Sequence, residues 1–135
     1  MGELQPEIRV LLEGRNFAHL ASLLPNGSPH SVPIWIGVEG DRIVFFTQPQ
    51  SRKAQNLERD GRVAISVTDQ DNPYRSAWIR GRVAGTRVGD EGLEIIDRIS
   101  NVYTGQPFPM RSGVVYEIEP ERSGFVELPF RHEPA

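Results

Sequence analysis

The chain has 135 residues, a net charge of −3 at pH 7 and no cysteine. This length suits one compact domain, so we expect residues 1–135 to form a single domain. The slight acidic surplus argues against a nucleic-acid partner, and the lack of cysteine excludes disulfides and thiolate chemistry. No apolar run approaches the length of a membrane span, and the N-terminal residues lack a signal-peptide core. The composition therefore predicts a cytoplasmic protein without a membrane partner.

The first half of the chain predicts one helix followed by three strands. Apolar residues recur at helical spacing over 6–13, a segment that opens on a proline and is followed by a glycine. Residues 16–47 indicate three strands, divided by hairpin-type turns at 25–28 and 39–41. The run IVFF at 43–46 has apolar residues on both faces, as expected of a central strand.

The second half of the chain continues the same alternation of strands and helices. The predicted elements are a helix over 51–60, a strand over 62–69, a long strand over 74–88 with possible bulges at Gly81 and Gly85, an amphipathic helix over 90–103, and one or two strands over 114–128. The total is about six strands, joined mostly by short turns. Such a meander predicts a mainly β fold with flanking helices, arranged as an antiparallel barrel.

A cluster of polar and cationic residues begins the predicted helix over 51–60. Ser51 suits the N-cap position, Arg52 and Lys53 follow it, and Thr47 ends the strand before it. Helix N-termini favour anions, an arginine can grip two phosphate oxygens, and a lysine adds a compact point charge. The cluster therefore suggests a phosphate-binding site.

A simpler interpretation of this cluster stays open. Arg52 and Lys53 can equally be solvated charges on the helix surface, balanced by Glu58 and Asp60. One observation favours the phosphate site. Lys53 is the only lysine in a chain with fourteen arginines. A narrow anion pocket is one place where a slim ammonium group cannot be replaced by a guanidinium.

The stretch from residue 43 to residue 67 resembles the pyridoxamine 5′-phosphate oxidase-like proteins. In that family a strand ends in an aromatic residue and Thr, Ser-Arg-Lys begins a helix, and an Arg-Val pair enters the next strand. The matching positions here are Phe46, Thr47, Ser51, Arg52, Lys53, Asp60, Arg62 and Val63. The resemblance is good over residues 15–88. It implies a six-stranded antiparallel split β-barrel of the FMN-binding type, assembled as a homodimer.

The resemblance also implies where a cofactor would bind. Arg52 and Lys53 would hold the phosphate of a flavin or deazaflavin, and the strand over 31–36 would run beside the ring. The cofactor-binding residues expected on this basis are Ser31, Pro33, Ile34, Trp35, Phe46, Thr47, Ser51, Arg52, Lys53, Asn56, Ser76 and Trp78. The alternative to cofactor binding is that residues 31–36, Ser76 and Trp78 occupy ordinary core or strand positions.

Catalytic residues are not identified by the sequence, and no metal-ligand spacing is present. His30 lies beside the expected cofactor strand and is a candidate proton donor. The chain ends FVELPFRHEPA and lacks the C-terminal segment with which pyridoxine-phosphate oxidases read their substrate. It looks more like the branch of the family that uses coenzyme F-420.

The resemblance therefore implies an oxidoreductase that binds reduced coenzyme F-420, a deazaflavin, and transfers hydride to an unsaturated small-molecule acceptor. The first alternative is an FMN-dependent oxidase or reductase of the same fold. The second alternative is a non-catalytic barrel that carries a flavin or haem.

Overall fold

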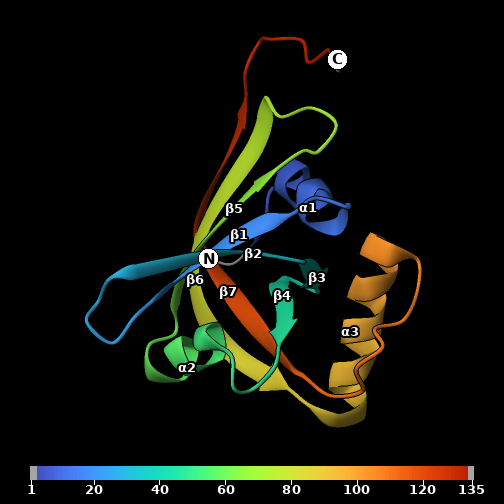
Figure 1. Ribbon diagram of the computed structural model, residues 1–135. Coiled ribbons are helices and arrows are strands. Elements are labelled where there is room, and N and C mark those ends of the chain that lie inside the picture. The colour runs from blue at the N-terminus through green and yellow to red at the C-terminus, as the bar shows by residue number, and fades with distance from the viewer. Residues whose placement is uncertain (1–2, 134–135) are drawn as a thin grey trace.

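The computed structural model describes residues 3–133, which form seven strands and three helices (Figure 1). The strands make one antiparallel sheet in the order β2-β1-β5-β6-β7-β4-β3. In chain order the elements are α1 (Pro6–Glu13), β1 (Ala18–Leu23), β2 (Pro29–Ile34), β3 (Gly37–Glu39), β4 (Arg42–Thr47), α2 (Arg52–Arg59), β5 (Arg62–Thr68), β6 (Arg75–Arg87), α3 (Gly89–Thr104) and β7 (Val114–Glu127).

The sheet curls because its two edge strands are neighbours in the chain. Only Trp35 and Ile36 separate the end of β2 from the start of β3, although these strands lie at opposite ends of the sheet order. Consecutive Cα atoms are 3.8 Å apart, so Ile34 and Gly37 lie within about 11 Å of each other. The sheet therefore bends round until its edges almost meet. We call the unpaired junction between β2 and β3 the seam.

The prediction of a mainly β antiparallel fold with flanking helices is confirmed. The predicted six-stranded barrel is not, because the sheet has seven strands and stays open at the seam. The difference arises within 29–39, where one strand was expected and two are found. A single straight strand through these residues cannot reach both edges of the curled sheet. The expectation of one domain over 1–135 stays a prediction.

The concave side of the sheet holds the larger apolar core. Side chains from the strands pack there against Ile8, Leu11 and Leu12 of α1 and against Ala54 and Leu57 of α2. Figure 1 shows these two short helices near opposite ends of the curled sheet. Burial of these apolar groups is the main source of stability, and it holds both helices against the sheet.

A second core lies between the sheet and α3. Ile95, Ile96 and Ile99 of α3 pack on Val44 of β4 and Val115 of β7. Strand β4 therefore has apolar cover on both faces, as the sequence predicts for residues 43–46. None of the helices within residues 3–133 has the length and apolar character needed to cross a membrane.

The predicted bulges in the long strand are confirmed. The pairing of β6 with β7 shifts register between Arg80 and Gly81 and again between Val83 and Gly85. A Cβ atom at Gly81 would lie 2.3 Å from the carbonyl oxygen of Glu119, so only glycine permits this close approach. The bulges allow β6 to bend and to contribute to the sheet along its whole length.

Candidate functional site

A groove beside the seam brings together residues from the end of β2, from β4 and from the start of α2. Its volume is about 330 Å³. The lining residues are Phe17, Pro33, Ile34, Trp35, Phe46, Lys53 and Phe108. The predicted site residues among them are Pro33, Ile34, Trp35, Phe46 and Lys53. The groove is therefore aromatic and apolar except for one cation.

Helix α2 begins at the end of the groove where Lys53 joins the lining, and Ser51 itself is not one of the lining residues. Ser51 is the N-cap, and its Oγ accepts a hydrogen bond of 3.1 Å from the backbone N–H of Ala54. The buried hydroxyl of Thr47 donates a second bond of 2.9 Å to the same Oγ. Both acceptor positions of Ser51 are then filled, so its own hydrogen remains free to donate. Thr47 supports Ser51 and does not itself line the groove.

Lys53 is the only cation of the groove lining, and it is half-buried. Burial lowers the pKa of its ammonium group from the ordinary value, because desolvation disfavours the charged form. None of the ion pairs within residues 3–133 involves Lys53. A partly desolvated cation without a carboxylate partner is well suited to bind an anionic ligand.

Arg52 is exposed on the helix surface and does not line the groove. Its guanidinium lies 3.4 Å from the side-chain oxygen of Gln55 on the same helix. Of the two cations predicted to hold a phosphate, only Lys53 lines the groove. The assignment of Arg52 to a phosphate stays a prediction.

The aromatic wall of the groove is held rigidly from behind. Trp35 stacks on Tyr103 of α3 with ring centroids 5.2 Å apart and an interplanar angle of 5°. The hydroxyl of Tyr103 donates a bond of 2.6 Å to the carbonyl of Asn16 and accepts one of 3.2 Å from the N–H of Ile36. Burial raises the pKa of the Tyr103 phenol, so this ring stays neutral. These contacts fix the position of Trp35 at the seam.

Two lining residues were missed by the sequence analysis. Phe17 precedes β1 and is 53% exposed, with its ring centroid 5.7 Å from that of Tyr103. Phe108 comes from the connection between α3 and β7, and its ring lies 4.9 Å from that of Phe46. A Phe between two prolines in the stretch QPFPM was the available signal, but an irregular loop gives no periodicity from which to place it.

Ser31, Asn56, Ser76 and Trp78 do not line the groove. Ser31 and Trp78 line a separate hollow of about 280 Å³ on the convex face of β1, β2, β5 and β6, and Ser76 lies on β6 opposite Thr68 of β5. Asn56 is fully buried, and its amide donates a bond of 3.1 Å to Ser22, so it joins α2 to β1. His30 lies on β2 opposite Ser22 and is also outside the lining.

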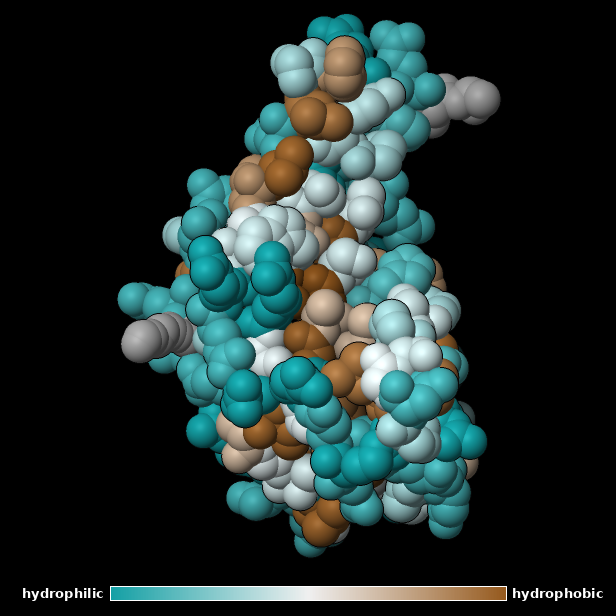
Figure 2. Space-filling model, turned by 90° about the vertical axis from the view of Figure 1, so that its left-hand side faces the viewer, coloured by the Kyte–Doolittle hydropathy of each residue, from teal (hydrophilic) through white to brown (hydrophobic). Residues whose placement is uncertain are grey.

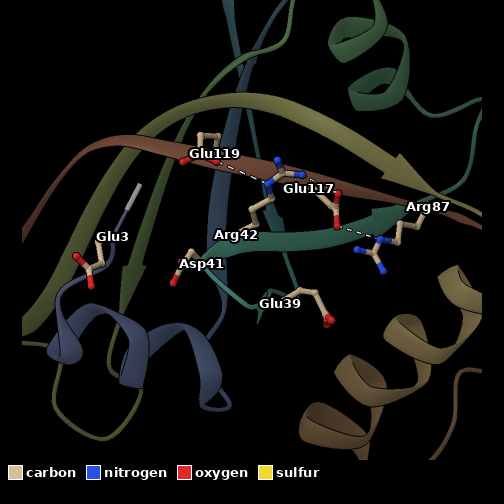
Figure 3. Close-up of a pocket in the computed structure, with 7 residues that line it drawn as sticks. All are labelled: Glu3, Glu39, Asp41, Arg42, Arg87, Glu117 and Glu119. Atoms are coloured by element: carbon tan, nitrogen blue, oxygen red, sulfur yellow. Dashed lines mark hydrogen bonds and ion pairs between the residues drawn. The ribbon is translucent and has the colours of Figure 1, made fainter. Parts of the chain in front are cut away.

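A larger hollow of about 560 Å³ has a different character (Figure 3). Five carboxylates and two arginines line it, and the buried Glu117 forms ion pairs of 3.1 Å with Arg42 and 3.0 Å with Arg87. These pairs connect β4, β6 and β7, so their charges already satisfy one another. No group of residues suited to a metal ion is found within 3–133. The aromatic groove therefore remains the candidate site.

The curled antiparallel sheet, its open seam and the aromatic groove beside the start of α2 define a protein of the split-barrel class. The sequence profile of the pyridoxamine 5′-phosphate oxidase family matches residues 4–127, and the chain belongs to this family. Most members of the family are oxidoreductases of the flavin type. No curated protein matches the sequence significantly.

Solved structures with the same fold agree with this family. An F-420 reductase is 27% identical, has a TM-score of 0.78, and is matched over 90% of this chain and 98% of that one. A conserved hypothetical protein from Mycobacterium tuberculosis is 24% identical with a TM-score of 0.74, over 98% and 92% of the two chains. HupZ of Group A Streptococcus is 17% identical with a TM-score of 0.65, over 92% and 94%.

Proposed function

We propose that the groove binds the deazaflavin coenzyme F-420 and that the protein is an oxidoreductase that reduces an unsaturated small molecule. The observation that carries this proposal is Lys53, a half-buried cation that lies at one end of an aromatic groove and has no ion-pair partner among residues 3–133. A phosphate at this end would receive a charge-assisted hydrogen bond from Lys53 and the free hydroxyl hydrogen of Ser51.

The remaining lining suits a planar heterocycle. Trp35 and Phe46 offer flat apolar surface, and Pro33 and Ile34 lie at the edge strand β2, where the backbone has unpaired polar groups. The groove volume of about 330 Å³ is at the small end of ligand sites, which are about 300–1,000 Å³. One protomer thus has room for part of a cofactor, such as its ring.

A bound reduced deazaflavin supplies a hydride, and the protein supplies position and electrostatics. Lys53 and Ser51 would hold the anionic end, and Trp35, which is stacked on Tyr103, would offer the ring a fixed apolar surface that excludes water. Lys53 is the only titratable side chain of the groove lining. We therefore assign the proton that completes the reduction to solvent.

The choice of coenzyme F-420 is supported by the F-420 reductase, which is similar over nearly the whole length of both chains. FMN is the second candidate, because the family to which the chain belongs binds flavins on this fold. A non-catalytic carrier would bind either cofactor without turnover.

A side-by-side fluorescence titration with coenzyme F-420 and FMN tests the proposal. We expect micromolar or tighter binding of F-420 and weaker binding of FMN. The reverse order would assign the protein to the FMN-dependent members. Binding of neither would refute a cofactor site in the groove. Tight binding without reduction of any acceptor in a panel of activated alkenes would favour the carrier.

We also propose that the protein is a homodimer that pairs through the convex face of β1, β2, β5 and β6. The side chains at the centre of this face are small and neutral, among them Ala21, Ala64 and Ser66. Figure 2 shows apolar groups on the narrow upper part of the molecule and in the middle of the face turned to the viewer, bordered by hydrophilic groups. Packing of two such faces would bring Ser31 and Trp78 to the interface.

Light scattering at micromolar concentration tests the dimer. We expect twice the mass of one chain, and we expect Ala64→Arg to give a folded monomer, because it places a charge at the centre of the interface. A wild-type monomer would refute the proposal.

A further inference from the structure

Phe108 differs from the other aromatic residues of the groove in how it is held. Trp35 lies in the short link between β2 and β3 and Phe46 in β4, whereas Phe108 lies in the irregular connection 105–113 between α3 and β7. Its ring is nevertheless packed at 4.9 Å from Phe46 and 6.2 Å from Trp35, at interplanar angles of 72° and 82°. The ring of Phe108 is therefore nearly perpendicular to the rings of Phe46 and Trp35, and together they form a corner of the groove. This corner limits how thick a ligand ring can be.

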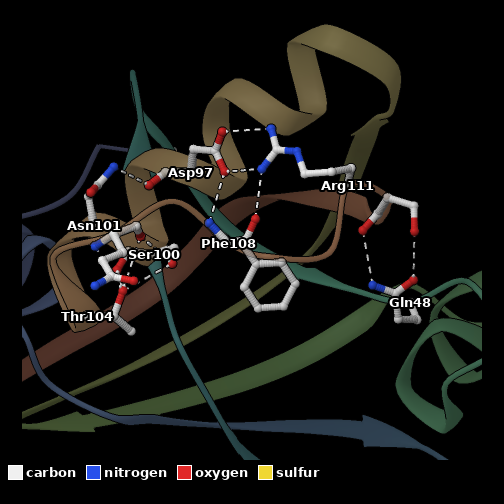
Figure 4. A network of polar contacts seen from close by, with 9 residues as sticks. Gln48, Asp97, Ser100, Asn101, Thr104, Phe108 and Arg111 are labelled. Carbon is white, nitrogen blue, oxygen red and sulfur yellow. Dashed lines mark hydrogen bonds and ion pairs between the residues drawn. The ribbon is translucent and has the colours of Figure 1, made fainter.

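The ion pair of Asp97 and Arg111 forms hydrogen bonds with both backbone polar groups of Phe108 (Figure 4). The backbone N–H of Phe108 donates a bond of 3.1 Å to Asp97 of α3, and its carbonyl accepts one of 2.8 Å from Arg111. Arg111 in turn donates to both carboxylate oxygens of Asp97, at 2.9 and 3.0 Å. We call this arrangement the Asp97–Arg111 clamp.

A second contact ties the same connection to the anion-binding end of the groove. The side-chain amide of Gln48 donates a bond of 3.1 Å to the carbonyl of Ser112, and the two side chains also approach each other at 3.5 Å (Figure 4). The backbone carbonyl of Gln48 accepts a bond of 3.0 Å from the N–H of Ser51, the N-cap of α2. The connection is therefore fixed both to α3 and to the turn that presents Ser51 and Lys53.

From these contacts we infer that Phe108 determines the shape of ring that the groove admits, and that the Asp97–Arg111 clamp is the device that holds Phe108 in place. This inference rests on the proposed function, because it concerns the same groove. A flat ring can lie against one side of the corner, whereas a thick aliphatic ring meets Phe108. Asp97 and Arg111 act through Phe108 and are positioning residues.

The clamp must be distinguished from an ordinary surface ion pair. The side chains of Asp97 and Arg111 are 27% and 53% exposed, and exposed pairs alone contribute little to stability. The chain contains a matched control in Asp60 and Arg62, with exposures of 29% and 65% and a shortest contact of 2.8 Å. Arg62 donates hydrogen bonds to Asp60 from its side chain and from its own backbone N–H. These bonds do not involve the connection that contains Phe108.

The holding of Phe108 is tested by fluorescence without any ligand. Trp35 and Trp78 are the only tryptophans, so a Trp78→Phe background leaves Trp35 as the single reporter inside the groove. In this background, Phe108→Ala and Arg111→Met are compared with the control Arg62→Met by acrylamide quenching and thermal unfolding. Phe108→Leu keeps an apolar side chain at the position if the alanine variant fails to fold.

We expect Phe108→Ala and Arg111→Met to increase quenching of Trp35 and to shift its emission to longer wavelength, while Arg62→Met changes neither. An increase in Phe108→Ala without one in Arg111→Met would overturn the role of the clamp. Unchanged quenching in Phe108→Ala or Phe108→Leu would show that Phe108 does not cover Trp35, and it would overturn the inference.

The selection of ring shape is tested with two phosphate esters of equal carbon number, phenyl phosphate and cyclohexyl phosphate, by NMR titration. Aromatic packing contributes a few-fold to affinity, so we expect wild type to prefer the phenyl ester. Phe108→Ala should lower this preference by about two- to tenfold. An unchanged preference would overturn the selecting role. If wild type binds neither ester and also binds neither coenzyme F-420 nor FMN, the proposed function is refuted. The quenching experiment would still show whether the Asp97–Arg111 clamp holds Phe108 in place.

Discussion

Lys53→Met gives opposite effects on stability and binding if Lys53 is the anion ligand of the groove. Methionine keeps most of the length and apolar volume of the lysine side chain but removes its charge. In the ligand-free protein the ammonium group is partly desolvated and has no ion-pair partner within residues 3–133. Because its pKa is lower in the folded state than in the unfolded state, the charge opposes folding at pH 7. The variant should therefore have a higher melting temperature than wild type.

The effect on binding follows from the strength of a charge-assisted hydrogen bond. Such a bond to a phosphate contributes about 1.5–3 kcal/mol, so its loss should weaken binding by about ten- to 150-fold. Arg52→Met is the matched control, since it removes one charge from the neighbouring residue of the same helix. Arg52 is exposed and outside the groove, so its removal should cost about 1 kcal/mol or less, or about fivefold, and this loss should vanish at high salt.

Fluorescence titration with coenzyme F-420 and FMN, repeated at two salt concentrations, measures the binding of both variants. Thermal unfolding without ligand measures their stability. Equal loss of affinity in Lys53→Met and Arg52→Met would refute the reasoning, because it would assign the effect to general charge. A lower melting temperature for Lys53→Met would show that the ammonium group has a stabilising partner.

Three further predictions follow from particular contacts. Ser51→Ala removes the N-cap bond of α2 and should lower the free energy of unfolding in urea by about 1 kcal/mol. Gly124→Ala would place a Cβ atom 2.6 Å from Nε1 of Trp78, which should cost about 1–3 kcal/mol, and the cost should disappear in a Trp78→Ala background. Arg111 holds the pKa of Asp97 below its usual range, so their pairing stabilises the protein above that range and is lost as the pH falls through the lowered pKa. The difference in melting temperature between wild type and Arg111→Met should be constant between about pH 7 and 5 and shrink below about pH 4.

The local elements of the fold were predictable because each carries its own signal in the sequence. The start of α2 at Ser51 follows from N-capping chemistry, and the alternation of β5 follows from a sheet with one buried face. The break between β2 and β3 has no such signal, because Trp35 and Ile36 are apolar residues that suit a strand. This break is imposed by the closure of the sheet, which is a long-range property.

The candidate site was predictable to the extent that one stretch of chain contains it. Lys53 and Phe46 belong to a local motif, whereas Phe108 reaches the groove from a loop more than fifty residues later in the chain. The sequence also could not decide which of Arg52 and Lys53 faces the groove, because this depends on the rotation of α2 against the core. That rotation is set by the burial of Ala54 and Leu57.

The seam has a mechanical consequence for the protein. Every other junction between neighbouring strands of the sheet is held by a hydrogen-bonded ladder, but β2 and β3 are connected only by the short link through Trp35. Elsewhere the barrel can widen only by breaking ladder bonds, whereas the seam can open slightly through small changes in the dihedral angles of this link. The seam is held closed by the contacts of Trp35 and Ile36 with Tyr103 of α3 in place of a ladder. Helix α3 therefore controls the width of the groove at the seam, and a change in that width needs no strand to leave the sheet.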